Sequence, residues 1–275
     1  MKVSWLVEDF NEDLGPFISE IQRQGHGLEV VKYVPFESGD YNAFTDDQCV
    51  IFHGSLNLMR QLQRQKKWVP GGWCDFKNFE CTTYYAHFGK YLLNDQYMMM
   101  PLAELLRRKC ELLEHYHGHF FVRPSTGFKS FTGQVLFDET FDKDVEWFVE
   151  FAKPEDIVVV SEARTLGMEF RFWVAQKKVI AGSLYKCKGE TVYERFDTAK
   201  HQIEALQFAE RVASEIWEPD PLYVIDVVGY ASAWRLLEIN SFSCSGIYAA
   251  DPEPLIREAS RIALEQWKEV ECLDG

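Results

Sequence analysis

Two apolar segments near the C-terminal end, YVIDVVGY (223–230) and WRLLEIN (234–240), constrain the fold of this chain more than any other feature. The short Gly-Tyr-Ala-Ser-Ala stretch that links them is typical of a tight turn, so the pair predicts an antiparallel β-hairpin. If the hairpin pivots at residue 232, Asp226 lies directly opposite Glu238. Asn240 follows Glu238 by two residues and therefore shares its face of the strand. The pattern thus gathers three oxygen-bearing side chains on an otherwise apolar ribbon.

Two carboxylates that are held close together repel each other unless a cation joins them. Hard oxygen ligands from Asp226, Glu238 and Asn240 suit Mg²⁺, which usually also binds the phosphates of a substrate. The alternative is an ordinary hairpin whose polar positions simply face solvent. The apolar neighbours of Asp226 and Glu238 on both sides favour the metal site.

The composition predicts a folded protein with reduced thiols. The hydrophobic content of 47% and aromatic content of 15% argue against disorder, and the net charge of −14 argues against a nucleic-acid-binding surface. The sequence contains no apolar run of about 18 residues, so we expect no membrane span. Early acidic residues in MKVSWLVEDFNED argue against a secretory signal. Seven cysteines without a CxxC motif suit a cytoplasmic protein better than a disulfide framework.

The first part of the chain, up to about residue 95, alternates between strand and helix patterns, which predicts a small α/β domain. The aromatic segment 68–94 shows no regular pattern, and we expect it to be irregular. Beyond it, PLAELLRRKCELLEHY (101–116) predicts one helix that begins at a proline. MEFRFWVAQKKVIAGSLYK (168–186) predicts a second hairpin.

The segment FVRPSTGFKSFTG (121–133) predicts a strand followed by a flexible glycine-containing loop. Such a loop offers backbone N–H groups that can fold over phosphates, with Arg123 in the strand and Lys129 in the loop as cations. The loop is not a Walker A motif, because no GK[ST] closes it. In the second hairpin, Glu169 and Arg171 share a face. They could form a surface ion pair, or Arg171 could engage a transferring phosphoryl group with its planar fork.

The order of these motifs resembles the ATP-grasp superfamily. A basic strand and a glycine-containing loop precede an apolar strand ending in Ser161-Glu162-Ala163, then Glu-x-Arg, and finally Asp and Glu-x-Asn in a hairpin. Arg123-Pro124, where many members carry Lys-Pro, looks like the group named for one arginine and two lysines, the R2K clade. Arginine keeps the charge at this position but changes the geometry.

The resemblance implies a mixed α/β and α+β protein in which two α+β lobes of an ATP-grasp fold sandwich ATP. A small Rossmann-like pre-ATP-grasp domain would span residues 1–95 and the ATP-grasp domain 96–275. Within the latter, a lid would span about 119–160 and a metal-binding subdomain about 161–275.

The resemblance also implies a role for each site residue. The adenine hinge would be formed by Val160, Ser161, Glu162 and Ala163, and Glu169 would belong to the nucleotide site. Arg123 and Lys129 would hold the α- and β-phosphates, Arg171 would face the γ-phosphate, and Lys186 would be the second lysine. The Mg²⁺ ligands would be Asp226, Glu238 and Asn240. The acceptor pocket would include Ser241, Ser243 and Ser245. His53, which ends a predicted strand, is a substrate-contact candidate from fold analogy alone.

The implied chemistry is ATP-dependent ligation of a carboxylate to an amine through an acyl phosphate. The amine would belong to an amino acid, a peptide or a protein. One alternative is a phosphotransferase that passes the γ-phosphate to a hydroxyl group. Another is an inactive nucleotide-binding module that serves as an interaction partner.

Overall fold

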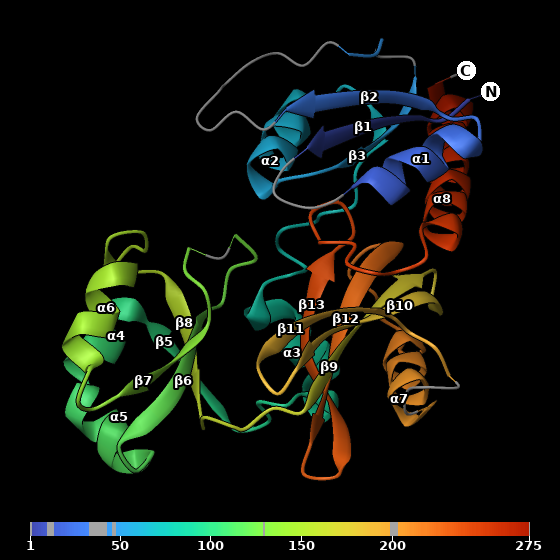
Figure 1. Cartoon of the computed structure of the whole chain (residues 1–275). Coiled ribbons are helices and arrows are strands. Elements are labelled where there is room, and N and C mark those ends of the chain that lie inside the picture. The colour runs from blue at the N-terminus through green and yellow to red at the C-terminus, as the bar shows by residue number, and fades with distance from the viewer. Residues whose placement is uncertain are drawn as a thin grey trace.

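The computed structural model describes residues 2–9, 14–32, 43–45, 48–128, 130–198 and 203–274. These residues form three β-sheets, each covered by helices (Figure 1). No helix among them is both long enough and apolar enough to span a membrane.

The first sheet is parallel and carries helices on both of its faces. Its strands, in spatial order, are β2 (Gly27–Lys32), β1 (Ser4–Asp9), β3 (Cys49–His53) and β4 (Val69–Gly71). One face packs against α1 (Gly15–Arg23) and α8 (Pro252–Asp274), and the other packs against α2 (Leu56–Gln65). Because both faces are covered, β3 is apolar along nearly its whole length and fully buried. The last helix of the chain therefore packs onto the first sheet.

The second sheet, which we call the lid sheet, is antiparallel. Its strands, in spatial order, are β5 (Tyr97–Pro101), β8 (Ile157–Ser161), β6 (His119–Pro124) and β7 (Gln134–Phe137). Three helices lie against this sheet: α4 (Leu102–Arg107), α5 (Lys109–His115) and α6 (Phe141–Val149). The single helix predicted over 101–116 is thus wrong. The chain leaves helical geometry at Arg108, where φ is −98° and ψ is 18°.

The third sheet has five antiparallel strands and comes last along the chain; it lies below the first sheet and beside the lid sheet in the view of Figure 1. Its strands, in spatial order, are β11 (Glu190–Arg195), β10 (Lys178–Cys187), β9 (Met168–Ala175), β12 (Leu222–Tyr230) and β13 (Ala233–Ser241). Two helices share a core with one face of it, α3 (Cys81–Phe88) and α7 (Ile203–Ala213).

Helix α3 lies inside the segment that we expected to be irregular, so that expectation is wrong for residues 81–88. Aromatic residues fill the helix and its surroundings, and the contrast between polar and apolar positions on which helix prediction depends is weak there. Tyr84, Tyr85 and Phe88 are all buried in the core beneath the five-stranded sheet. Tertiary packing therefore stabilises this helix more than its own sequence pattern does.

The C-terminal hairpin forms as predicted, and Asp226 lies opposite Glu238. The pivot, however, is not residue 232. Ala231 and Ser232 form a two-residue turn, both with positive φ, which pairs Tyr230 with Ala233 and Val227 with Leu236. Regular pairing from that turn would place Leu237 opposite Asp226. A β-bulge absorbs Leu237 and restores the register, so Glu238 and Asn240 reach the same face as Asp226.

Candidate active site

The centre of the candidate site is a buried ion pair between two neighbouring strands. Arg171 on β9 lies directly opposite Asp226 on β12. Its Nε donates to Asp226 Oδ1 at 2.8 Å, and its second terminal nitrogen donates to Oδ2 at 2.7 Å. Asp226 is fully buried, and Arg171 is 6% exposed. Burial by itself disfavours a charged guanidinium, but the facing Asp226 carboxylate raises the pKa of Arg171 above its usual value.

Glu238 and Asn240 extend this pair along β13. The Asn240 amide Nδ2 donates to Asp226 Oδ2 and to Glu238 Oε1, each at 3.0 Å. Asn240 therefore bridges the two carboxylates that would otherwise repel each other. The three candidate ligands thus meet at one point, as the hairpin pattern predicts.

Arg123 reaches this cluster from the lid sheet. Its terminal nitrogen donates to Glu238 Oε2 at 2.8 Å, so the pair joins β6 of the lid to β13 of the five-stranded sheet. Burial opposes the charge on Arg123, but neighbouring groups, including Tyr84, Cys81 and Glu238, hold its pKa well above the usual value. Two arginines from different sheets therefore compensate one buried carboxylate, Asp226, and one half-buried carboxylate, Glu238.

Glu169 and Lys186 lie beside Arg171 on the same face. Lys186 pairs with Glu169 across β9 and β10, just after a β-bulge at Tyr185. The bulge lets the Tyr185 hydroxyl donate to Glu169 Oε2 at 2.9 Å. Burial raises the pKa of Glu169, while the Tyr185 hydrogen bond and the Lys186 charge act against this rise. Bulges are common beside active sites because they re-aim side chains, and both bulges described here do so.

Two tyrosines hold the Arg171 side chain from its sides, and no local pattern marks either of them as a contact of Arg171. The guanidinium carbon lies 5.4 Å from the Tyr185 ring centre and 5.0 Å from that of Tyr248, and the two rings stack with centres 5.2 Å apart. The loop after β13 also contributes the Gly246 carbonyl, which accepts from Arg171 at 3.2 Å. Arg171 is therefore fixed in one orientation.

The predicted hinge lies where the lid sheet joins the rest of the molecule. Val160 pairs with Met98 and Val122 inside the sheet, and its side chain is in the lid core. Ser161 is buried, and its Oγ has no hydrogen-bond partner among the described residues. Glu162 and Ala163 follow the last paired residue of β8, and the Glu162 side chain is 67% exposed.

Arg164, which the sequence analysis missed, links the two chain segments that enter and leave the lid. Its guanidinium donates to the Leu93 carbonyl and, at 2.9 Å, to Asp95 Oδ1. It also lies over the Tyr230 ring, 4.9 Å from the centre. No local motif marks this role, because the partners are about 70 residues away along the chain.

The serines and the histidine predicted to contact the substrate differ in their surroundings. Ser243 Oγ accepts from the Trp73 N–H at 2.9 Å, and Ser245 Oγ donates to the Ser241 carbonyl at 2.5 Å, so both hydroxyls hold the loop together. His53 is buried between Phe17 and Phe242, where burial lowers its pKa to about 4. Ser241 lines a small cavity beside Asn240. Lys129 lies outside the described residues.

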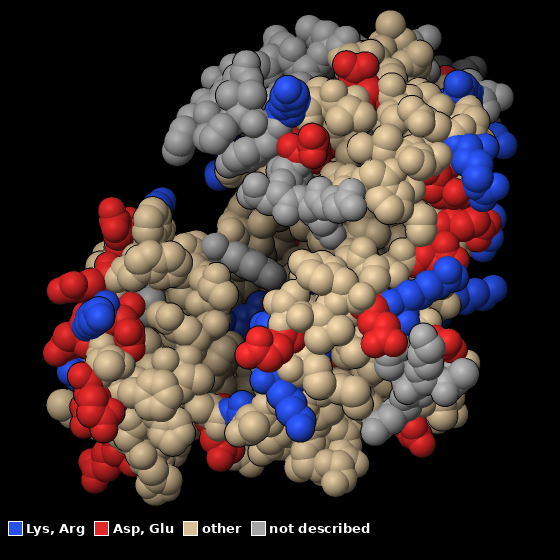
Figure 2. Space-filling view, viewed as in Figure 1, with Lys and Arg blue, Asp and Glu red and all other residues tan. Residues whose placement is uncertain are grey.

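The small cavity of about 90 Å³ lies where the three parts of the molecule meet. Its walls come from α2, the 74–79 segment, the lid and β13. Figure 2 shows the molecule hollowed between the lid and the rest of the chain, with basic side chains visible within the hollow. Arg123 and Asn240 both line the cavity, so it opens directly beside the candidate metal ligands.

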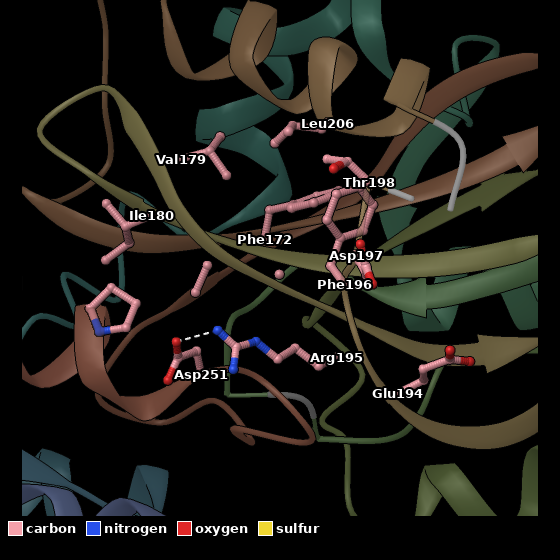
Figure 3. A pocket seen from close by; sticks show the side chains of 13 residues that line it. Phe172, Val179, Ile180, Glu194, Arg195, Phe196, Asp197, Thr198, Leu206 and Asp251 are labelled. Carbon is pink, nitrogen blue, oxygen red and sulfur yellow. Dashed lines mark hydrogen bonds and ion pairs between the residues drawn. The ribbon is translucent and has the colours of Figure 1, made fainter. Parts of the chain in front are cut away.

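A larger pocket of about 690 Å³ lies elsewhere, between β10, β11, α7 and the start of α8 (Figure 3). Phe172 and Phe196 form its apolar wall, and Arg195 forms an ion pair with Asp251 at its edge. Phe172 follows Arg171 on β9 and so points to the opposite face of the sheet. This pocket is therefore separate from the candidate site.

A family model described as "ATP-grasp domain, R2K clade family 2" matches residues 105–257, which is more than half of the chain. The chain belongs to this ATP-grasp family. The resemblance seen in the motif order is therefore confirmed. None of the curated proteins compared with the chain matches it.

Solved structures with the same fold include several ligases. The crystal structure of the D-cycloserine synthetase DcsG has a TM-score of 0.62 at 13% identity, covering 95% of this chain and 99% of that one. D-alanine–D-alanine ligase from Bacillus anthracis, complexed with ATP, has a TM-score of 0.60 at 14% identity, with both chains fully covered. The ATP-grasp ligase PsnB, complexed with a minimal precursor, has a TM-score of 0.55 at 14% identity, covering 95% and 100%. These likenesses confirm the ATP-grasp fold class.

Proposed function

We propose that this ATP-grasp protein is an ATP-dependent ligase that joins a carboxylate to an amine through an acyl phosphate. The observation that carries the proposal is the meeting of Arg123 and Arg171, from two different sheets, at the Asp226–Glu238–Asn240 cluster. A polyphosphate between the two sheets would meet both cations and the cluster of oxygen ligands. The ligase names of structural neighbours support the same reaction class.

The donor set fits Mg²⁺. Two carboxylates and an amide oxygen are hard ligands, and rotation of the Asn240 side-chain amide would bring its oxygen to the position of its nitrogen. The described residues hold no group of three or more His, Cys, Asp or Glu that could bind a metal, so Asn240 is needed to complete a set of three. Bound Mg²⁺ would supply charge neutralisation at the phosphates.

The chain's own residues would bind and orient the phosphates of ATP and neutralise their charge. Arg171, fixed by Asp226, Tyr185 and Tyr248, would hold the γ-phosphate without having to reorganise as charge develops. Arg123 and Lys129 would hold the α- and β-phosphates from the lid, and Lys186 would add a cation beside Glu169.

At the other end of the nucleotide, the backbone after Val160, from Ser161 to Ala163, would bind adenine. Glu162 would contact adenine or ribose.

In the reaction, a carboxylate oxygen of the donor attacks the γ-phosphorus, and the bond to the β,γ-bridging oxygen breaks. ADP leaves, and the donor becomes an acyl phosphate. The amine nitrogen then attacks the acyl carbon, inorganic phosphate leaves and the nitrogen loses a proton. Because these steps require positioning and charge neutralisation, no protein nucleophile is needed.

The amine would approach along the loop from Ser241 to Tyr248, which also supports Arg171. Names among the structural neighbours include a D-alanine ligase and a ligase bound to a precursor peptide, so an amino acid or a peptide are both candidate acceptors. All three serine hydroxyls of the loop make structural hydrogen bonds, that of Ser241 by accepting from the Cys244 N–H at 3.2 Å, but Ser241 is the one that also lines a cavity.

The test is carboxylate-dependent phosphate release from Mg·ATP, with hydroxylamine to trap the acyl phosphate as a hydroxamate. Asp226→Asn and Glu238→Gln should each lower turnover by about 100-fold or more, because each removes charge at the metal site. Glu215→Gln, which changes a partly exposed carboxylate paired with Lys90, is the matched control and should retain activity. Circular dichroism would verify that each variant is folded.

Full turnover in both site variants would overturn the assignment. A stable phosphorylated product that hydroxylamine does not trap would instead favour a phosphotransferase. Nucleotide binding without any turnover across carboxylate pools would favour a binding module.

A further inference from the structure

The small cavity beside Asn240 has the chemistry of a specific subsite. Ten residues line it: Leu56, Cys74, Phe76, Phe79, Arg123, Gly127, Ile239, Asn240, Ser241 and Cys244. They come from α2 of the first sheet, from the segment before α3, from the lid and from the end of β13. A ligand here would therefore touch every part of the molecule while lying next to the candidate metal ligands.

Six of the ten lining residues carry a hydrocarbon side chain or a thiol. Leu56, Phe76, Phe79 and Ile239 contribute hydrocarbon, and Cys74 and Cys244 contribute the thiols. Burial, together with the neighbouring Cys74, raises the pKa of Cys244 well above its usual value, so this thiol stays neutral. A neutral buried thiol behaves as a small apolar group rather than as a nucleophile.

The polar side chains of the cavity belong to Arg123, Asn240 and Ser241. Among the described residues that line it, Arg123 is the charged one, and the amide of Asn240 lies beside it. No described lining residue is acidic, and the adjacent Glu238 carboxylate is already engaged by Arg123 and Asn240. Glu8, whose charge acts on Cys244, does not line the cavity, and its Oε2 accepts from the Ser55 N–H at 2.6 Å. The lining therefore matches an anion with an uncharged apolar tail.

The volume limits the length of that tail. About 90 Å³ is room for roughly three water molecules at about 30 Å³ each. An acid with about three or four carbon atoms would fill this space if its carboxylate lay at the Arg123 side. An aromatic acid or a peptide segment would be too large.

We propose that this cavity is the acyl-donor subsite and that the donor is a short, apolar monocarboxylate without an α-ammonium group. The inference rests on the proposed ligase function and adds the substrate class to it. The carboxylate would face Arg123 and Asn240, where it meets the γ-phosphate, while the alkyl chain lies against Leu56, Phe76 and Cys244.

The experiment measures hydroxamate formation from Mg·ATP, hydroxylamine and a series of acids. The series contains acetate, propionate, butyrate, hexanoate and benzoate, with alanine and glutamate as amino acid donors. We expect the highest kcat/KM for propionate or butyrate. The value for hexanoate should be at least about 10-fold lower, since one methylene in an apolar pocket changes selectivity by roughly that factor. The value for alanine should also be at least about 10-fold lower, because its charged ammonium group would lose its water without gaining an acidic partner among the lining residues.

Two variants change the volume of the cavity in opposite directions. Leu56→Ala enlarges the cavity and should shift the preference toward hexanoate, whereas Cys244→Leu fills it and should shift the preference toward acetate. Leu106→Ala, a similar truncation in a lid helix packed in a different core, is the control and should leave the order of acids unchanged. The readout is the ratio of kcat/KM values between acids, which a general loss of stability does not change.

The outcomes separate this inference from the proposed function. Hydroxamate formed preferentially from alanine, glutamate or benzoate would overturn the subsite assignment and leave the ligase intact. An unchanged acid preference in both cavity variants would also overturn it. Failure of every carboxylate to give a hydroxamate would overturn the ligase function, and the donor subsite with it.

Discussion

Asp220 tests how burial of a carboxyl group makes the stability of this protein depend on pH. It lies between α7 and β12, where its Oδ2 accepts from the Asp75 N–H at 3.0 Å and so ties the segment beside the small cavity to the five-stranded sheet. Burial raises the pKa of Asp220 from 3.8 to about 7, and the nearby Asp75 and Glu218 carboxylates add to the rise. Between about pH 4 and pH 7, Asp220 therefore keeps a proton in the folded protein that it has already released in the unfolded chain.

The size of the stability change follows from the linkage between proton binding and folding. A pKa difference of about three units corresponds to roughly 4 kcal/mol, since each unit is about 1.4 kcal/mol. Because the folded-state pKa lies above the unfolded-state value, the stability from this group is fully present below about pH 4 and is lost as the pH rises to about 7. Between pH 5 and pH 8, this group should lower the free energy of unfolding by about 3 kcal/mol.

Asp220→Asn removes the titration but keeps an oxygen that can accept from the Asp75 N–H. Urea unfolding of both proteins, measured by circular dichroism from pH 5 to pH 8 at constant ionic strength, should show the variant gaining about 3 kcal/mol relative to the wild type. Asp138→Asn, an exposed substitution in the lid, is the matched control. A difference between Asp220→Asn and wild type that stays constant over this pH range would refute the burial argument.

Two further predictions concern the register and the hinge. Deleting Leu237 should preserve ATP turnover, because Glu238 then follows Leu236 directly and still pairs with Asp226. Deleting Val227 should abolish turnover, because it moves Asp226 away from its partner on the neighbouring strand. Phosphate release measures both, and equal activity of the two deletions would contradict this register. Arg164→Leu should raise the KM for ATP by about 10-fold, because it removes the hydrogen bonds that join the segments entering and leaving the lid. Arg211→Leu, on the surface of α7, is the control. An unchanged KM for Arg164→Leu would show that other contacts hold the lid.

The sequence by itself determined the C-terminal hairpin and its polar cluster. Alternating apolar residues and a short turn require Asp226, Glu238 and Asn240 to lie on one strand pair, because side-chain direction in a strand follows a period of two. The motif order also pointed to the ATP-grasp family, because the order of basic and acidic motifs along the chain can be read without knowing how the chain packs. Even here, the bulge at Leu237 was invisible, and the predicted register was right for a different reason.

The tertiary structure alone decided which charges compensate one another. Arg123 and Glu238 are 115 residues apart, and nothing local predicts that a lid arginine reaches that carboxylate. The same is true of Arg171 between Tyr185 and Tyr248, and of the small cavity walled by three parts of the chain. Local patterns specify which way a side chain points within its own element, but contacts between sheets depend on how the whole chain packs.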